Sequence, residues 1–564
     1  MAPEALECPV VDVIIIGAGP CGLAAAARLR EETPSALFTD EEHQRYHWLK
    51  RHSGRMALVR AHNRTLNSAG KHGRRVSQKG QKGEVHWCKT GTKSCTGTRS
   101  PSQPSILVLD SSGDRWLEKW NRSFEKLQIP CLRSPMFFHV DPGDRDGMLA
   151  FSRETGREDE LWEIPGCVGQ ELSKHKKKKR QSMPSSKVEI AIDERDRKDY
   201  FSPSTKLFAD HCTFTASRYG LDKSGQILVQ EARDITYDYV PDYSNTEKLF
   251  TVKTDKGCFH AKAVVLAIGP GNTKNMPWQM SKTEITGACH SLDIKTFPDP
   301  GLKAKIKSRR ETNVVVVGGG LSSAHIIDMA VKAGVSKVWH FTRGELKVKH
   351  FDIGLTWMGK FKNYEKAVFW SAESDEERLD MIKTARNGGS ITPRMHKVLK
   401  QHVAHKKLSI CTHTTIASKY YDPVSGTWQL DTTPPMPDLP RIDYIYFATG
   451  VSSNVAELPL LGSMNRDHPI EIKQGLPCIT EDLTWKHDIP LLVTGRLAAL
   501  QLGPGAANLE GARLGAERIA WTLERALGRA KDEDRELSRV SFCGHGNRYD
   551  CLSNQPQHSV MVSA

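Results

Sequence analysis

Two glycine turns are the residues of this sequence whose types and spacing point most directly to chemistry. The first, Gly17-Ala-Gly19-Pro-Cys-Gly22, follows the β-branched run Val11–Ile16 and precedes an Ala-rich stretch, residues 20–32, that favours a helix. In such a unit the first glycine permits the tight turn, the second lets a pyrophosphate approach the backbone, and the third lets helix and strand pack closely. The helix N-terminus then faces the phosphate charge. We therefore predict a dinucleotide site at Gly17, Gly19 and Gly22 rather than a chance glycine loop.

An acidic residue at the end of the second strand should bind the ribose hydroxyls of that dinucleotide. Asp40 lies at about the expected offset of 20 residues from the turn, whereas Asp110 ends the better strand, residues 105–110. Gly113 and Trp116 follow Asp110 and resemble a flavin-contacting turn. We therefore favour Asp110 and Trp116 as FAD contacts, with Asp40 as the alternative ribose ligand.

The second glycine turn, Gly318-Gly-Gly320-Leu-Ser-Ser323, follows the apolar residues 314–317 and precedes a helical stretch at 324–333. Ser323 stands in place of the third glycine and is small enough for fairly close helix packing. The next strand, Lys337–Phe341, is followed by Arg343 where an NAD site would offer Asp or Glu. A guanidinium suits a 2′-phosphate, so we predict NADPH rather than NADH. The alternative is that Arg343 is only a solvated residue at a strand end.

Residues 443–450, Asp-Tyr-Ile-Tyr-Phe-Ala-Thr-Gly, carry a resemblance to a known family. They match the D-x-x-x-[L/F]-A-T-G pattern of the flavin-dependent N-hydroxylating monooxygenases that act on lysine and ornithine side-chain amines. Val451 stands where that family usually has Tyr. His290-Ser291 resembles the family's H-S turn, which also occurs in the flavin-containing monooxygenases. The resemblance implies the cofactors FAD and NADPH and an oxygenation reaction, but no particular amine.

Three further glycine turns are predicted to contact the cofactors. Gly269 and Gly450 each follow a strand and resemble turns at which such chains cross between domains, and Gly495 resembles the last flavin-contacting turn. Many relatives have Gly-Asp where this chain has Gly495-Arg496. The helix predicted to begin near Asn508 could stabilise negative charge at the flavin, with a capped packing helix as the alternative.

No residue is assigned with certainty to catalysis. His290 and Asn508 are the candidates: the resemblance implies that His290 binds or orients NADP⁺, although a lone histidine is more often a hydrogen-bonded structural residue. No metal site is predicted, because the thirteen cysteines form no C-x-x-C pair and no zinc-like Cys/His spacing. This cysteine usage fits a reducing compartment.

The predicted fold class is α/β, with two Rossmann-like domains of which the NADPH domain is inserted in the FAD domain. We assign residues 11–40, 105–300 and 441–529 to the FAD domain and residues 301–440 to the NADPH domain. Residues 41–104 are predicted to be a basic disordered insert and residues 530–564 a flexible tail.

The formal charge of +14 is concentrated in that insert, where residues 43–105 hold fourteen Lys or Arg and one acid, Glu84. Few aromatic residues are available there for base stacking, so we favour a solvated loop over a nucleic-acid partner. No apolar run approaches the length of about 20 residues that spans a bilayer, and a cytoplasmic location is predicted. The basic run 174–180 (KHKKKKR) leaves nuclear import open. The sequence does not fix an oligomeric state.

The function that we predict is an FAD- and NADPH-dependent monooxygenase. It would form a flavin hydroperoxide from O₂ and oxygenate a small nucleophilic acceptor, such as an amine. One alternative is a regulatory protein that binds FAD and NADPH with little or no catalysis, since a fold does not determine function. A second alternative, a pyridine nucleotide-disulfide oxidoreductase, is disfavoured because it needs a C-x-x-C pair beside the flavin.

Overall fold

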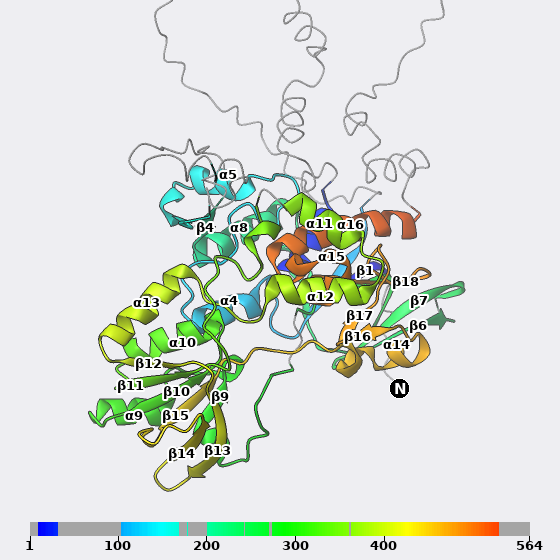
Figure 1. Ribbon diagram of the computed structural model, residues 1–564. Helices are drawn as coiled ribbons and strands as arrows, with labels where there is room; N and C mark the ends of the chain where they lie inside the picture. The colour runs from blue at the N-terminus through cyan, green and yellow to red at the C-terminus, as the bar shows by residue number, and fades with distance from the viewer. Residues whose placement is uncertain are drawn as a thin grey trace, which may run out of the picture. The chain divides into compact units, whose positions relative to one another are not determined.

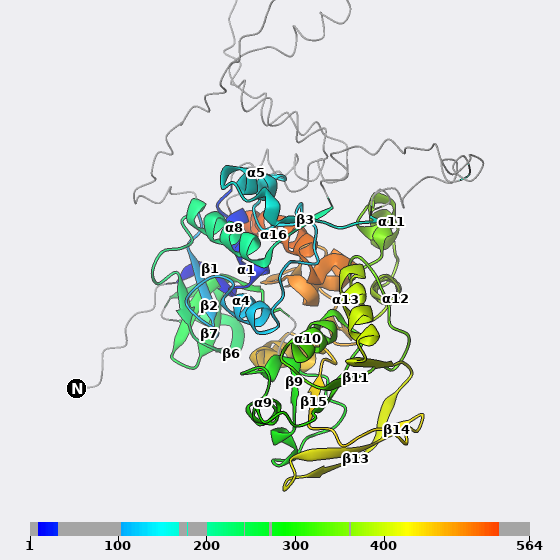
Figure 2. The same ribbon diagram turned by 90° about the vertical axis from the view of Figure 1, so that its left-hand side faces the viewer.

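The computed structural model describes residues 10–31, 103–167, 178, 200–241, 243–269, 273–359 and 362–528. Within these residues the chain forms two largely parallel sheets with helices packed against them (Figures 1 and 2). The predicted α/β fold class is therefore confirmed. The predicted insert up to residue 102, the tail 530–564, Asp40, and the basic run 174–180 apart from Lys178 lie outside the described residues.

The first sheet is built around β1 (Val11–Ile16), whose side chains from Val13 to Ile16 are buried. Strand β1 pairs in parallel with β2 (Ile106–Asp110) on one side and β8 (Cys258–Leu266) on the other. The strand order is β18-β19-β8-β1-β2-β5, and β6 and β7 form a hairpin that joins the sheet through β8. These outer strands are β5 (Ile227–Val229), β6 (Ala232–Val240), β7 (Ser244–Thr254), β18 (Thr484–Lys486) and β19 (Ile489–Val493).

Helices α1 (Pro20–Arg28) and α16 (Leu509–Ala526) pack against each other beside this sheet. Helix α1 ends four residues before the predicted stretch does, and its alanines at positions 24–27 are fully buried. Small side chains allow the two helix axes to approach closely. Arg28 Nε donates to Glu517 Oε2 at 2.6 Å, and both side chains are buried. This ion pair fixes α16 against the C-terminal end of α1.

The second sheet is entirely parallel, with strand order β12-β11-β10-β15-β9. Two of its strands lie outside the predicted range 301–440: β9 precedes residue 301, and β15 follows residue 440. Its strands are β9 (Ala288–His290), β10 (Asn313–Val317), β11 (Lys337–Phe341), β12 (Leu408–Cys411) and β15 (Tyr444–Phe447).

The two faces of the second sheet are covered by different elements, as the alternation of β10 requires. Val314 and Val316 pack with α9 (Pro300–Lys307), α10 (Leu321–Lys332) and α13 (Pro393–Ala404). Val315 packs on the other face with Trp428 and Leu430 of the hairpin β13 (Thr415–Asp422) and β14 (Thr427–Thr433). Both views show the sheet between α10 and α13 on one side and this hairpin on the other (Figures 1 and 2).

Most buried side chains of the segment between β11 and α13 pack on the core of the first sheet, while Leu346 and Ile391 near its two ends pack on that of the second. Those on the first core include Phe351, Trp357 and Phe369, and they belong to the cluster that contains β1. Arg133 holds the point where this segment begins: its guanidinium donates to the carbonyl oxygens of residues 349, 350, 351 and 390 and to the Ser390 hydroxyl, at 2.8–3.2 Å. The segment contains α11 (Lys362–Trp370) and α12 (Asp375–Arg386).

The remaining described elements connect these layers. The helices are α4 (Glu118–Lys126), α5 (Gly147–Glu154), α8 (Thr205–Arg218), α14 (Gly462–Asp467) and α15 (Ala499–Leu502). Two small antiparallel sheets consist of β3 (Leu161–Glu163) with β4 (Phe201–Pro203) and β16 (Ile472–Lys473) with β17 (Leu476–Pro477). No helix in the described part of the chain is long and apolar enough to cross a membrane.

A buried polar cluster lies where α5 and α8 meet. His211 on α8 is 1% exposed, and neither of its ring nitrogens has a hydrogen-bond partner among the described residues. Burial, and to a lesser degree the positive charge of Arg218, lower the pKa of His211 to about 3. The neighbouring His139 is also buried and its pKa is also lowered, first by burial. Both imidazoles are therefore neutral in the folded protein near neutral pH.

We expect His211 to make the protein sensitive to acid. In the unfolded chain His211 binds a proton below pH 6.5, its usual pKa. In the folded chain the same imidazole stays neutral down to about pH 3. The free energy of unfolding should therefore fall with pH across this window, by up to about 1.4 kcal/mol per pH unit for this group. Urea unfolding followed by tryptophan fluorescence between pH 7 and pH 4 measures the slope.

His211→Leu removes this titration and breaks no hydrogen bond, so its unfolding free energy should depend less steeply on pH than that of the unaltered chain. His413→Gln is the control, because the His413 side chain is exposed and pairs with the exposed side chain of Glu345. Equal slopes for the unaltered chain and His211→Leu would show that His211 is not the responsible group.

Candidate functional site

The first glycine turn joins β1 to α1, and two of its glycines are required by close backbone contacts. Gly17 has φ +110°, and a Cβ there would lie 2.4 Å from the Ala267 carbonyl oxygen. A Cβ on Gly22 would lie 2.1 Å from the Gly17 carbonyl oxygen. A Cβ on Gly19, in contrast, would meet nothing within 4 Å. The turn is thus closed by Gly17 and Gly22 and leaves open space at Gly19.

Asp110 and the turn that follows it are held directly against this first glycine turn. Asp110 Oδ2 accepts from Ala18 N at 2.7 Å, and Oδ1 accepts from Ser112 N at 2.6 Å. A carboxylate has about four acceptor positions, so two of them can still accept from a ribose. Trp116 is half-buried, and its Nε1 donates to the Leu221 carbonyl at 2.8 Å. This hydrogen bond fixes the position of the indole ring.

Two of the remaining predicted turns end other strands of the first sheet. Gly269 follows β8 with φ +71° and has open space around its Cα. Gly495 follows β19 with φ +69°, and a Cβ there would lie 3.3 Å from Cys21 Sγ in the first turn of α1. Burial raises the pKa of the Cys21 thiol to about 11, partly offset by its hydrogen bond with Thr494. The structure therefore brings Gly17, Gly19, Asp110 and Gly495 to one edge of the first sheet.

The second glycine turn repeats this arrangement on the second sheet. Gly318 has φ +139°, and a Cβ there would lie 2.3 Å from the Ala448 carbonyl oxygen, whereas a Cβ on Gly320 would meet nothing within 4 Å. Ser323 is fully buried and donates from Oγ to the Gly320 carbonyl at 2.6 Å. A hydroxyl thus replaces the third glycine and ties α10 to its own turn. Gly389 packs against this turn, and a Cβ there would lie 3.2 Å from Gly320 N and Cα.

Both glycine-turn helices begin without a side-chain cap. Gly19 and Gly320 are the N-cap residues of α1 and α10, and neither can supply a side-chain acceptor. Helices α8, α9, α12 and α13 are instead capped by Ser204, Asp299, Ser374 and Thr392. An uncapped helix N-terminus offers N–H donors and a positive dipole end to an anion.

Two buried histidines hold the carbonyl groups of glycine turns on the second sheet. His290 is 1% exposed; its Nδ1 accepts from Leu292 N at 3.3 Å, so the proton lies on Nε2, which donates to the Gly450 carbonyl at 3.0 Å. His340 on β11 is fully buried, and its Nε2 donates to the Gly318 carbonyl at 2.6 Å. Burial lowers the pKa of both imidazoles. The candidate His290 is thus placed to position Gly450, and His340, which sequence reasoning missed, positions Gly318.

Arg343 lies exposed at the end of β11, and within the described part of the chain its side chain has no hydrogen bond or ion pair. The nearby Lys347 donates to the carbonyl and side-chain oxygens of Asn387, and Lys349 donates to the carbonyl oxygens of Asp352 and Arg386. These two lysines therefore bind the C-terminal end of α12. Arg343 is the cation at this strand end that stays available for a ligand.

Asn508 is the N-cap residue of α16, but its side chain does not cap that helix. Asn508 Nδ2 donates to Asp352 Oδ1 at 3.0 Å, while Asp352 Oδ2 pairs with Arg386 at 2.9 Å. Arg386 also donates to the Pro504 carbonyl at 2.9 Å. This network fixes the start of α16, and the side chain of its N-cap residue forms no hydrogen bond with the helix.

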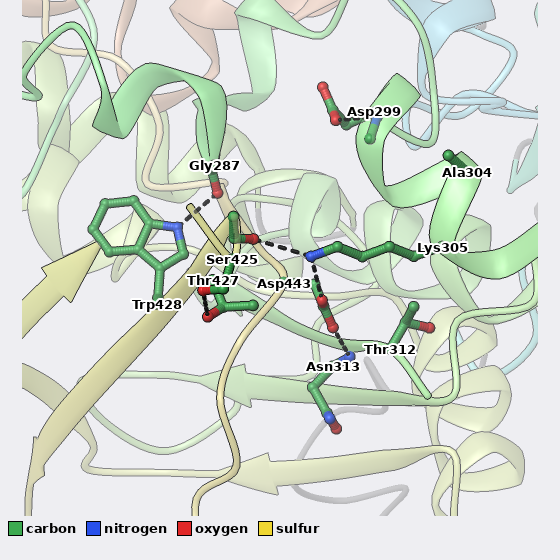
Figure 3. Close-up of polar contacts among 12 residues, drawn as sticks. Gly287, Asp299, Ala304, Lys305, Thr312, Asn313, Ser425, Thr427, Trp428 and Asp443 are labelled. Carbon is green, nitrogen blue, oxygen red and sulfur yellow. Dashed lines mark hydrogen bonds and ion pairs between the residues drawn. The ribbon is translucent and has the colours of Figure 1, made fainter. Parts of the chain in front are cut away.

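The motif at residues 443–450 spans the second sheet from one edge to the other. Asp443 lies before β15, where its Oδ1 accepts from Lys305 Nζ and its Oδ2 accepts from Asn313 N, both at 2.7 Å (Figure 3). Lys305 also donates to the Gly426 carbonyl at 3.0 Å. Gly450 lies beyond the opposite end of β15, two residues after Ala448, whose carbonyl group contacts Gly318. The acid of the motif is therefore a structural clamp between α9, β10 and β15, and its glycine lies at the end of the sheet that carries the second glycine turn.

Residues 199–450 match the model of the family L-lysine 6-monooxygenase/L-ornithine 5-monooxygenase. The predicted family resemblance is confirmed. No curated protein sequence matches the chain significantly.

Solved structures of N-hydroxylating monooxygenases share the fold at low sequence identity. The ornithine N-hydroxylase of Kutzneria sp. 744, solved with reduced FAD, NADP⁺ and L-ornithine, has a TM-score of 0.55 and 13% identity over 92% of this chain and 99% of that chain. The FAD-bound cadaverine monooxygenase of Erwinia amylovora has a TM-score of 0.55 and 13% identity, over 91% and 94%. The reduced ornithine hydroxylase of Pseudomonas aeruginosa has a TM-score of 0.54 and 14% identity, over 92% and 100%.

We expect Asp443→Asn to destabilise the protein. The substitution leaves the Lys305 ammonium group without its counter-ion in a site where Asp443 is only 10% exposed. Hydrogen bonds to charged groups contribute about 1.5–3 kcal/mol, so the free energy of unfolding should fall by roughly that amount. Urea unfolding measures the change. Asp438→Asn, at an exposed position of the same region, is the control, and equal stability of the two variants would contradict the clamp.

Proposed function

We propose that this chain is an FAD- and NADPH-dependent monooxygenase. The observation that carries the proposal is the pair of uncapped glycine turns, each with open space where its second glycine could admit a phosphate. Side chains fill neither position, so the donor sets of both turns fit a dinucleotide pyrophosphate. The structures of relatives that contain FAD and NADP⁺ support the choice of these two cofactors.

The residues at the edge of the first sheet are proposed to hold FAD. The α1 N-terminus at Gly19 would donate to the pyrophosphate, and Asp110 would accept from the ribose hydroxyls while its bonds to Ala18 and Ser112 keep it in place. The turns at Gly269 and Gly495 and the N-terminus of α16 at Asn508 would border the rest of the cofactor. Trp116 would line the same edge without donating, because its N–H is already bound to Leu221.

The residues at the edge of the second sheet are proposed to hold NADPH. The α10 N-terminus at Gly320 would donate to the pyrophosphate, and Arg343 would pair with the 2′-phosphate. His290 would position the Gly450 carbonyl next to this edge, and Ser323 would fix the first turn of α10.

When both cofactors are bound, they supply the reduction of O₂ and the transfer of one oxygen atom to a nucleophilic acceptor. The protein's own part is to hold the two dinucleotides by their phosphates and to exclude water from the space between them. No acid–base pair in the described residues has to be assigned for this role. The acceptor is proposed to be a small molecule, such as an amine, and the cytoplasm is the proposed location.

Gly19→Ala tests the proposal because the added methyl meets no protein atom in the structure. The variant should fold as stably as the unaltered chain but lose FAD, since the methyl would lie where the pyrophosphate approaches. The measurements are flavin absorbance of the purified protein, NADPH consumption, and mass spectrometry of acceptors after incubation with NADPH and O₂. Gly17→Ala is the contrast: it should lower stability itself, because its methyl would meet the Ala267 carbonyl.

The unaltered protein is expected to be yellow and to form an oxygenated product. A colourless protein that leaves NADPH unchanged would rule out the monooxygenase. A protein that binds FAD and NADPH but yields no oxygenated product would instead support the regulatory alternative.

Arg343→Ser should lower kcat/KM for NADPH by about 10- to 100-fold, equivalent to about 1.4–2.7 kcal/mol, and leave kcat/KM for NADH nearly unchanged. The reason is that only NADPH carries the 2′-phosphate that Arg343 is proposed to bind. Lys347→Gln is the matched control, because the Lys347 ammonium group is bound to Asn387 at the same strand end. An equal decrease in kcat/KM for NADPH and for NADH would show that Arg343 does not bind the 2′-phosphate.

A further inference from the structure

Cationic side chains gather beside the last predicted flavin-contacting turn, where they line a cavity of about 320 Å³. The walls of this cavity come from α12, the loop after β15, the turn between β16 and β17, and two short helices, η7 (Gly495–Ala498) and η8 (Pro504–Ala507). Helix α12 contacts α15 and β16 here, as Figure 1 shows. Because Arg496 directly follows Gly495, the cavity adjoins the site proposed for FAD.

Arg496 is a cation that the surrounding protein does not neutralise. It is half-buried and has no ion pair within the described residues; its Nη1 donates to the Val451 carbonyl at 3.3 Å. The other ionisable side chains of the lining are Lys383 and Arg386, and no Asp or Glu is among the described residues that line the cavity. Lys383 differs from Arg496 in that it pairs with Asp380 at the exposed surface.

Further cations surround one acid, Asp352, next to this cavity. Arg386 pairs with Asp352 at 2.9 Å, and burial, opposed by Asp352 and reinforced by Arg386, lowers the pKa of Arg133 to about 10. Burial, and then the charge of Arg133, lower the pKa of Lys349. Burial, and then the charge of Arg386, lower the pKa of Arg496. These four cations therefore lie close enough to repel one another, and one carboxylate cannot balance them.

The positive charge at Arg496 is a departure of this chain from proteins that share the turn. Many relatives have Asp directly after the glycine, whereas this chain has Gly495-Arg496. A positive charge thus stands where those proteins place a negative one. Helix α16 contacts η7, and its N-terminus, which no side chain caps, adds the positive end of a helix dipole. Both features favour negative charge beside the turn.

Reduction of a flavin by NADPH creates negative charge. Hydride transfer moves two electrons and one proton, so the flavin gains one unit of negative charge while the nicotinamide ring becomes the cation of NADP⁺. A fixed cation nearby lowers the free energy of the reduced, anionic flavin more than that of the oxidised, neutral flavin. Partial burial strengthens this effect, because less water screens the charge.

We propose that Arg496, supported by Arg386, raises the reduction potential of the bound flavin. Arg496 acts through its charge and is not required to contact the oxygen acceptor. The inference rests on the proposed function for the place of FAD. It adds to that function the residue that makes reduction by NADPH more favourable than an acidic or uncharged residue after Gly495 would.

Arg496→Gln tests the proposal in the FAD-loaded protein. The reduction potential is measured from flavin absorbance during slow reduction by xanthine and xanthine oxidase with a reference dye, so neither NADPH nor an acceptor is needed. We expect the equilibrium constant for reduction to fall at least tenfold, which corresponds to about 30 mV for a two-electron couple. Arg496→Lys keeps the charge and should restore most of the potential. Arg496→Asp should lower the potential further than Arg496→Gln.

Arg310→Gln is the matched control, because it removes the same charge from an exposed position outside the cavity. Its potential should equal that of the unaltered protein. An Arg496→Gln variant that keeps both FAD and the original potential would overturn the inference. So would a variant that fails to bind added FAD, or binds it weakly at an unchanged potential, because the guanidinium would then hold the cofactor rather than tune it.

The proposed function can fail separately from this inference. A protein that binds FAD and shows the expected shift in potential, but forms no oxygenated product, would support the role of Arg496 and contradict the monooxygenase. An oxygenated product together with an unchanged potential in Arg496→Gln would give the opposite result. A protein that binds no FAD would overturn both.

Discussion

Both glycine turns of this protein depend on one steric constraint, the approach of a neighbouring strand's carbonyl group to the first glycine of the turn. Ala267 on one sheet and Ala448 on the other place their carbonyl oxygens where the Cβ of Gly17 or Gly318 would be. The contact lets the central strand end and the helix begin within a few residues, so that the helix N-terminus faces outward from the sheet edge. A side chain at either glycine would push the neighbouring strand away and misdirect the helix.

The N-termini of α1 and α10 favour a negatively charged ligand because no side chain caps either helix. Gly19 and Gly320 leave the first turns of α1 and α10 uncapped, whereas four other helices are closed by Ser, Thr or Asp. Neutral histidines, rather than charged groups, hold the carbonyls of Gly318 and Gly450. Electrostatic preference at these edges thus comes mainly from backbone dipoles, which stay fixed as pH changes.

The sequence was sufficient for the elements whose geometry is local. The strands at 337–341 and 444–447, the helix at 375–386 and both glycine turns are where periodicity and glycine spacing predicted them. Contacts between distant residues could not be predicted in this way. The presence of His340 within an apolar strand was a sequence signal for a buried polar contact. Its bond to Gly318, however, depends on the pairing of β10 with β11, which the sequence pattern does not give.

The same limit explains the residues around Asp443 and Arg386. The spacing of residues 443–450 indicated a family, yet it could not show that Asp443 bonds to Lys305 at the edge opposite Gly450. The cationic lining at Arg386 and Arg496 combines segments more than a hundred residues apart, and no periodic pattern in the chain relates them. Asp40 remains a sequence prediction, since it lies outside the described residues.

Arg133 has a consequence for how the two sheets could move. Its five hydrogen bonds hold residues 349–351 and 390 to the loop after α4, at the two places where the chain leaves the second sheet and returns to it. Separating these two connections from Arg133 would leave its guanidinium and four carbonyl groups without these hydrogen bonds. A movement of one sheet against the other that keeps these bonds would therefore leave the Arg133 contacts in place and alter the connections that flank β9 and β15.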